Sequence, residues 1–152
     1  MSLRDRISSE LKTAMKAKDS EKLATLRLIN AAIKDREIAA RSDGTGGELS
    51  DGDLVAVLTR MVKQRRDSAR AYEEAARLDL AEKELAEIGT IETFLPRQLN
   101  DDEIARAIDA AISETGAASV RDIGKVMGLL KARHAGEMDF GKAGAVLKSR
   151  LA

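Results

Sequence analysis

The sequence is poor in the residue types that most often build reactive or metal-binding sites. Its 152 residues include no cysteine, no tryptophan, one proline and one histidine. Without cysteine, the chain forms no disulfide, thiolate metal site or thiol nucleophile. We interpret the lone histidine, His134, as a residue at a helix end, near the last carbonyl groups. We therefore expect no metal and no cofactor. No catalytic residue is predicted either, because no nucleophile with its base is recognisable.

Long apolar segments are also missing. No apolar run approaches 18 residues, and the start of the chain, "MSLRDRISSELKTAMK", has no apolar core of a signal peptide. These features predict a cytoplasmic protein that neither crosses nor binds a membrane.

The charge is balanced and aromatic residues are scarce. Lys and Arg number 26, Asp and Glu also number 26, and three residues are aromatic. The whole-chain charge therefore gives no sign of nucleic-acid binding, and base stacking on aromatic rings is disfavoured. Residues 121–152 differ, with seven basic residues against three acidic ones. Such an excess can hold a few phosphates but does not drive tight nonspecific binding.

Apolar residues recur at helical spacing along nearly the whole chain, and no segment alternates as a strand does. We predict an all-α protein with a four-helix N-terminal domain over 1–95 and a three-helix tail domain over 97–152. Pro96 separates the two, since helices seldom continue past the residue before a proline. The predicted helices cover about 3–17, 20–41, 51–77, 79–95, 100–115, 119–135 and 139–152, with a glycine-rich connection over 42–50.

Four helix starts are predicted from cap patterns, in which a polar residue is followed three positions later by an acidic one. The pairs are Ser50 with Asp53, Asp79 with Glu82, Asn100 with Glu103, and Ser119 with Asp122. Asp139 is expected to start the last helix.

The stretch "RDIGKVMGLLKARHAG", residues 121–136, contains two glycines one helical turn apart. A phosphate-binding P-loop requires a glycine where Ser119 stands and a serine or threonine where Val126 stands, after a strand. None of these conditions is met, so a P-loop is rejected.

A helical wheel of this stretch separates two faces. The predicted core face consists of Ile123, Val126, Met127 and Leu130. The opposite face carries Gly124 and Gly128, flanked by Arg121, Lys125 and Ala132, with Lys131 nearby. Because glycine has no side chain, a partner backbone can approach this strip closely. We interpret it as a contact surface for RNA or a partner helix; the alternative is a glycine pair tolerated on a solvated face.

The third predicted helix, over about 51–77, carries a stripe of basic residues on one side. The stripe consists of Arg60, Lys63, Arg66, Arg70 and Arg77. Asp67 and Glu74 fall within it at i,i+4 spacing from Lys63 and Arg70, which favours a self-compensated solvated face over an RNA-binding one.

Arg65 lies on the apolar face of that helix, and Asn30 and Glu92 lie on apolar faces of other helices. A buried charge must be paired. With the chain reversing near residues 78 and 79, Arg65 would lie opposite position 92. We therefore predict a structural ion pair between Arg65 and Glu92, with Asn30 as a further acceptor; the alternative is a functional pocket with an open, unpaired Arg65.

Several separate motifs together resemble the YqeY-like family over essentially all 152 residues. They are "LATLRLINAAIKDREI", "VKQRRDSARAYEEAARLDLAEKELAEI", "FLPRQLNDDEI" and "ISETGAASVRDIGKVMGLL", in this order. That family is related to the helical tail of the B subunit of the tRNA-dependent glutamyl/aspartyl amidotransferase. The resemblance implies a helical fold with a three-helix tail and an association with tRNA metabolism. It also implies the class label of a carbon–nitrogen ligase with glutamine as amide donor.

Three functions follow as hypotheses. The first is a non-catalytic module associated with tRNA or a tRNA-modifying complex, in which Arg121, Lys125 and Lys131 meet the sugar–phosphate backbone. The second is a protein–protein adaptor that docks a partner helix on the strip of Gly124 and Gly128. The third is amidotransferase activity within a complex, with catalysis supplied by partners.

Overall fold

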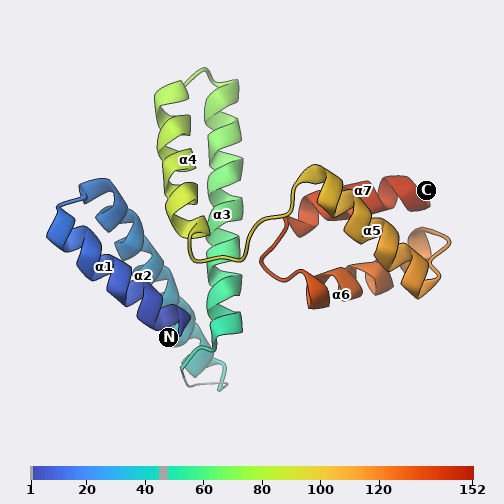
Figure 1. Cartoon of the computed structure of the whole chain (residues 1–152), viewed down its shortest axis with the longest axis horizontal. Helices are drawn as coiled ribbons and strands as arrows, with labels where there is room; N and C mark the ends of the chain where they lie inside the picture. The colour runs from blue at the N-terminus through green and yellow to red at the C-terminus, as the bar shows by residue number, and fades with distance from the viewer. Residues whose placement is uncertain (1, 45–47) are drawn as a thin grey trace. The chain divides into compact units, whose positions relative to one another are not determined.

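The computed structural model describes residues 2–44 and 48–152, and within them every regular element is helical. The prediction of an all-α fold is confirmed. Residues 45–47 of the predicted glycine-rich connection lie outside the described residues. The elements, drawn in Figure 1, are α1 (Leu3–Ala17), α2 (Ser20–Ser42), α3 (Asp51–Glu74), α4 (Leu78–Glu92), α5 (Asp101–Thr115), the 3₁₀ turn η1 (Val120–Asp122), α6 (Ile123–Arg133) and α7 (Phe140–Leu151).

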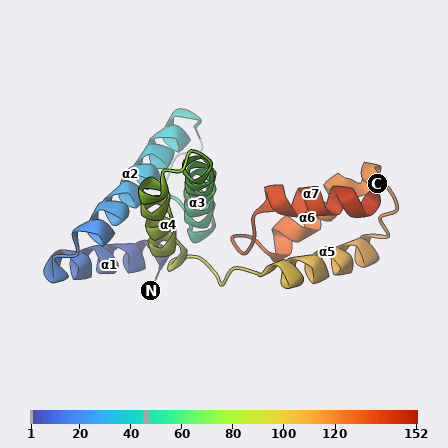
Figure 2. The same ribbon diagram turned by 90° about the horizontal axis from the view of Figure 1, so that it is seen from above.

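The chain divides into two compact units, residues 1–95 and 96–152. In unit 1, α1 and α2 form one antiparallel hairpin and α3 and α4 form another (Figures 1 and 2). Leucine and isoleucine side chains from the four helices meet in one core; Leu26, Ile29, Leu54, Leu58 and Ile91 are fully buried in it. None of the described helices is both long and apolar enough to cross a membrane.

Most predicted helix starts are confirmed by their hydrogen bonds. The side chains of Ser50 and Asn100 each accept a bond from the backbone N–H three residues later, and their own backbone N–H groups donate the reciprocal bond of a capping box to the carboxylates of Asp53 and Glu103. Asp139 accepts bonds from two backbone N–H groups at the start of α7. Ser119 caps η1 rather than α6, so the helix predicted from residue 119 is a 3₁₀ turn followed by an α-helix.

The turn between α3 and α4 differs from the prediction. α3 ends at Glu74, and Ala76 takes a left-handed conformation with φ of 59°. The backbone N–H of Arg77 then donates to the carbonyl of Tyr72, at 2.8 Å, and α4 begins at Leu78. The predicted cap of Asp79 with Glu82 is wrong, because Arg77 is the N-cap residue and no side chain caps this helix.

The predicted ion pair between Arg65 and Glu92 is also wrong. Nε of Arg65 lies 2.9 Å from Oε2 of Glu87, while Glu92 pairs with Arg66 at 3.3 Å. The reason is the position of the turn: because the chain reverses near Ala76, Arg65 faces a residue earlier in α4 than position 92. Asn30 is exposed and is not an acceptor for Arg65.

Unit 2 packs α5, α6 and α7 around a small core. Ile108, Val126, Leu130 and Leu147 are almost completely buried in it. α5 ends at Gly116, whose φ of 69° is the left-handed conformation that glycine adopts without strain. The segment before α5 is held to the loop between α6 and α7, since the N–H of Leu99 donates to the carbonyl of Glu137 at 2.8 Å.

Candidate functional site

The candidate contact face lies on α6 and begins at the turn that precedes it. The carboxylate of Asp122 accepts hydrogen bonds from the N–H groups of Ala118, at 2.9 Å, and Ser119, at 3.3 Å. These bonds hold the pKa of Asp122 below its ordinary value, so the carboxylate stays ionised. The closed turn fixes the direction in which α6 leaves.

The two faces of α6 are arranged as the helical wheel predicts. Val126 and Leu130 are buried, and Ile123 and Met127 are half-buried against the same core. Arg121, Gly124, Lys125, Gly128, Lys131 and Ala132 are all exposed. The predicted contact residues are therefore solvent-exposed, Arg121 in η1 and the others on α6, while the predicted core face is turned to the core.

The glycines of this face border open space. A Cβ atom added to Gly124 or Gly128 would meet no heavy atom within 4 Å. Neither glycine has the positive φ that would require it. The fold of unit 2 therefore does not need glycine at either position.

The basic residues of unit 2 fall into a paired group and an unpaired group. The paired ones contact acidic residues: Arg97 with Glu103, Arg133 with Glu114, Lys142 with Asp101, and Arg150 with Asp109. Five have no carboxylate of the described residues within ion-pairing distance: Arg121, Lys125 and Lys131 near the α6 face, Arg106 on α5 and Lys148 on α7. The positive charge of the α6 face is therefore available to an external anion.

His134 lies at the C-terminal end of α6, as predicted. It is half-buried, and its backbone N–H donates to the carbonyl of Leu130 at 2.8 Å. Its ring Nδ1 lies 3.4 Å from Oε2 of Glu137 in the following loop. Among residues 2–44 and 48–152, no group of three or more His, Asp or Glu side chains is placed to hold a metal ion.

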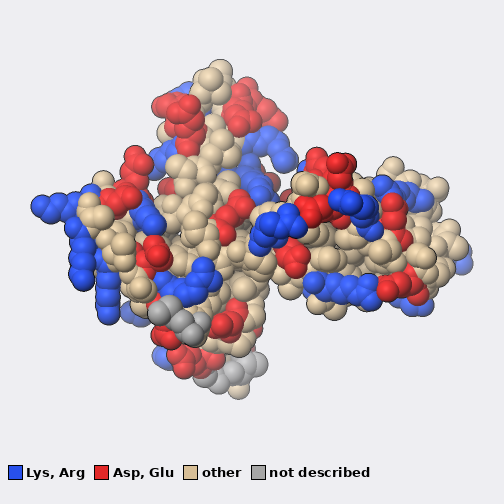
Figure 3. Space-filling view, in the orientation of Figure 1, with Lys and Arg blue, Asp and Glu red and all other residues tan. Residues whose placement is uncertain are grey.

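The basic stripe of α3 is compensated in part. Lys63 pairs with Asp67 at 3.6 Å, and Arg66 and Arg77 also have acidic partners. The predicted i,i+4 pair of Arg70 with Glu74 does not form, and Glu74 is the last residue of the helix. In the view of Figure 3, basic and acidic side chains alternate over both units. This interspersed pattern is that of an ordinary solvated surface.

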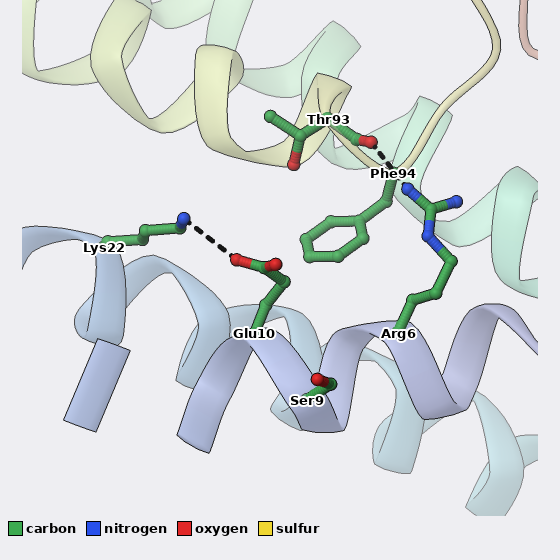
Figure 4. A pocket seen from close by; sticks show the side chains of 6 residues that line it. All are labelled: Arg6, Ser9, Glu10, Lys22, Thr93 and Phe94. Atoms are coloured by element: carbon green, nitrogen blue, oxygen red, sulfur yellow. Dashed lines mark hydrogen bonds and ion pairs between the residues drawn. The ribbon is translucent and has the colours of Figure 1, made fainter. Parts of the chain in front are cut away.

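A pocket of about 310 Å³ in unit 1 was not predicted from the sequence. Figure 4 shows the six residues that line it: Arg6, Ser9, Glu10, Lys22, Thr93 and Phe94. Each of its charged side chains has a partner among the lining residues. The guanidinium of Arg6 donates to the carbonyl of Thr93 at 3.0 Å and lies 5.7 Å from the centre of the Phe94 ring, and Lys22 pairs with Glu10 at 3.0 Å.

These contacts fasten α1 to the end of α4, so we interpret the pocket as a structural clamp. Arg6 and Thr93 lie 87 positions apart in the chain, and no local sequence pattern indicates such a contact.

Comparison with known proteins identifies one matching family and several curated relatives that share one name. The model of one family, described as Yqey-like protein, matches residues 4–151. Curated relatives carry the name "Altered inheritance of mitochondria protein 41, mitochondrial". The relative from Clavispora lusitaniae is 36% identical over 107 residues, which cover 69% of this chain and 59% of the relative. The one from Vanderwaltozyma polyspora is 28% identical over 124 residues, covering 77% and 64%. The chain thus spans about three fifths of the length of these relatives.

Proposed function

Because the chain belongs to the Yqey-like protein family, we propose that it is a non-catalytic helical module associated with tRNA or with a tRNA-modifying complex. One observation supports this proposal most directly: Lys125 and Lys131 of α6, and Arg121 in the turn η1 before it, are exposed and unpaired among the described residues. Lysine and arginine contacts to phosphates supply most of the affinity of sequence-independent nucleic-acid binding. The adjacent glycines leave room for a sugar–phosphate backbone to approach the helix.

The proposal assigns no chemical step to this chain. The sequence resemblance to the tail of the amidotransferase B subunit suggests participation in tRNA-dependent amidation, with glutamine as the amide donor. In that case, partner subunits carry out the amide transfer, and this chain contributes contacts to tRNA. Such contacts position the nucleic acid without reading its sequence.

The test is the binding of unmodified tRNA to the full chain, measured by fluorescence anisotropy over a series of salt concentrations. Affinity should fall as salt rises, because each phosphate contact releases counterions. Lys125→Ala and Lys131→Ala should each weaken binding and each reduce the slope of log affinity against log salt by up to about 0.9.

Lys142→Ala is the matched control, since it removes the same charge from the same unit. Lys142 is already paired with Asp101 at 2.7 Å, so its loss should leave the salt slope unchanged. Equal effects of all three substitutions would mean that net charge alone governs binding. Unchanged affinity in both Lys125→Ala and Lys131→Ala would refute the phosphate-contact proposal.

A second candidate function, a protein–protein adaptor, is favoured by the open space beside Gly124 and Gly128. Small residues one turn apart allow two helix backbones to pack closely. Gly128→Leu should then abolish docking while the unit stays folded, because position 128 is exposed. Helix docking would respond little to salt, which separates this function from tRNA binding.

The compartment is part of the proposal. The sequence predicts a cytoplasmic protein, whereas the relatives bear names of mitochondrial proteins. Fractionation of source cells, followed by detection of the chain beside a marker of each compartment, distinguishes the two.

A further inference from the structure

Helix α2 has two apolar faces, and the fold uses one of them. Leu26, Ile29 and Ile33 are buried in the core of unit 1. On the opposite side, Leu28 is 45% exposed and Ile38 is 55% exposed. Ala24 and Ala31 are also exposed and extend this second face along α2. In Figure 2, α2 lies at the edge of unit 1. The exposure of Leu28 and Ile38 shows that no described helix covers them.

The second face has the spacing of a coiled-coil seam. Positions 24, 28, 31, 35 and 38 are separated alternately by four and three residues. This is the a/d repeat by which one helix packs along another. Asp35 occupies one of these positions among apolar neighbours. A polar residue at a single seam position fixes the register of a partner helix.

A row of positive charges borders this seam. Arg27, Lys34 and Arg41 follow one another at intervals of seven residues and are all exposed. No carboxylate in the described part of the chain lies within ion-pairing distance of them. By contrast, Lys22 and Glu37 of the same helix pair with α1, at 3.0 and 2.6 Å. Three of the four unpaired cations of α2 thus lie beside the uncovered apolar face; the fourth, Arg36, lies outside this row and acts electrostatically on Asp53 of α3.

The charge pattern argues against a second copy of the chain as the occupant. In an antiparallel pair of α2 helices, the cation row would face the same row of the other copy, and like charges at these positions repel. In a parallel pair, the row would face the other edge of the seam, which contains Thr25, Ala32 and Ala39 and no acidic residue. Neither arrangement neutralises the three cations.

We propose that this face of α2, the α2 seam, docks an amphipathic helix of another protein that carries acidic residues at heptad spacing. The partner's apolar residues would cover Leu28 and Ile38, and its acidic residues would face Arg27, Lys34 and Arg41. This mode of binding is helix packing along an apolar seam, with charge pairs at the rim that select the partner. The α2 seam belongs to unit 1 and does not depend on the function proposed for α6.

The experiment uses a displayed library of peptides, each 23 residues long like α2. The peptides have alanine or leucine at the a and d positions and random glutamate or lysine at the e and g positions. Selection against the full chain, followed by sequencing, should enrich glutamate at heptad intervals. Binding of an enriched peptide should weaken at least about tenfold in the triple variant Arg27→Glu, Lys34→Glu, Arg41→Glu, since attraction becomes repulsion at three places.

The matched control carries three charge reversals on another helix: Lys12→Glu, Lys16→Glu and Lys18→Glu. These lysines are exposed on or just after α1 and belong to no ion pair of the described residues. The control should bind the enriched peptide like the unchanged protein. The apolar part of the α2 seam is tested by Ile38→Asp, which should also weaken binding and, at an exposed position, leaves folding intact.

Each other outcome overturns the proposal. These outcomes are no enrichment, enrichment indifferent to charge, and equal weakening by the control reversals. Sedimentation that shows self-association lost in the Ile38→Asp variant would identify a second copy as the occupant. Binding to vesicles with anionic headgroups, lost in the same triple variant while no peptide is enriched, would identify a lipid surface instead.

Discussion

The ion pair between Arg65 and Glu87 gives the sharpest test of how unit 1 is held together. Both side chains are mostly buried, with exposures of 15% and 18%, and the Nε–Oε2 distance is 2.9 Å. Arg65 also donates from Nη1 to the carbonyl of Met61 at 3.3 Å. Replacing Arg65 with methionine keeps most of the volume but leaves the carboxylate of Glu87 without its partner.

The magnitude follows from burial. Removing one partner of a buried pair costs about 3–5 kcal/mol, because an uncompensated charge remains inside the protein. Water retains some access to both groups, so we expect Arg65→Met to lower the free energy of unfolding by about 3 kcal/mol. The double variant Arg65→Met with Glu87→Leu removes both charges and should recover to within about 1 kcal/mol of the unchanged protein.

The assay is urea unfolding followed by the fluorescence of Tyr72. This residue is the single tyrosine of a chain without tryptophan, and it lies on α3, so it reports on unit 1. Arg66→Met is the matched control. Its pair with Glu92 is more exposed, at 37% and 28%, and should contribute about 0–1 kcal/mol. Equal losses in the two single variants, or a double variant no more stable than Arg65→Met, would refute this account of the pair.

Three further predictions concern unit 2, with stability followed by circular dichroism. Gly116→Ala should destabilise the unit by about 1–2 kcal/mol. The left-handed backbone at this position, with φ of 69°, is strained for a residue with a Cβ, although no neighbouring atom would contact the added Cβ. The pKa of Glu103 is lowered from 4.5 to about 2, chiefly by its hydrogen bond with Arg97. The stability that the Glu103 carboxylate contributes is therefore present above pH 4.5 and lost as the pH falls toward 2. The difference in free energy of unfolding between the unchanged protein and Glu103→Gln should accordingly shrink over this pH range. The double variant Gly124→Ala, Gly128→Ala should raise the free energy of unfolding by about 1 kcal/mol, mainly through the interior position 128, and weaken tRNA binding; no gain in stability would show that the fold constrains these positions.

Local patterns predicted local structure well, and the reason is physical. A cap such as Ser50 with Asp53 is made within four residues, and the faces of α6 depend only on helical periodicity. Neither requires knowledge of the neighbouring helices. The exposure of Gly124, Lys125 and Gly128 therefore follows from the amino-acid sequence by itself.

Contacts between helices were harder to predict than local structure. An error of a few residues in the position of a turn displaces every expected residue pair between the two helices that it joins. The sequence placed the reversal near residues 78 and 79, whereas the chain turns near Ala76. In an antiparallel hairpin, a displaced turn shifts the expected partner by twice the displacement. Arg65 was therefore matched to Glu92, five positions beyond its partner Glu87. The position of Arg65 on an apolar face predicts that it is paired, but the sequence does not identify Glu87 as the partner.

The glycines of α6 have no explanation within the described chain. Gly128, in the interior of α6, is expected to cost the helix about 1 kcal/mol relative to alanine, and Gly124, the second residue of the helix, is expected to cost less. A glycine can be required by a positive φ or by a neighbour too close for a Cβ, and neither condition holds at Gly124 or Gly128. Gly116 meets the first condition, so glycine there serves the fold. A cost without an internal benefit means either that the glycines serve a contact outside the fold or that they are tolerated, since natural proteins are rarely at their stability optimum. If alanine at both positions stabilises the protein and weakens tRNA binding, the glycines serve the contact; if it stabilises the protein and binding is unchanged, they are a tolerated pair on a solvated face.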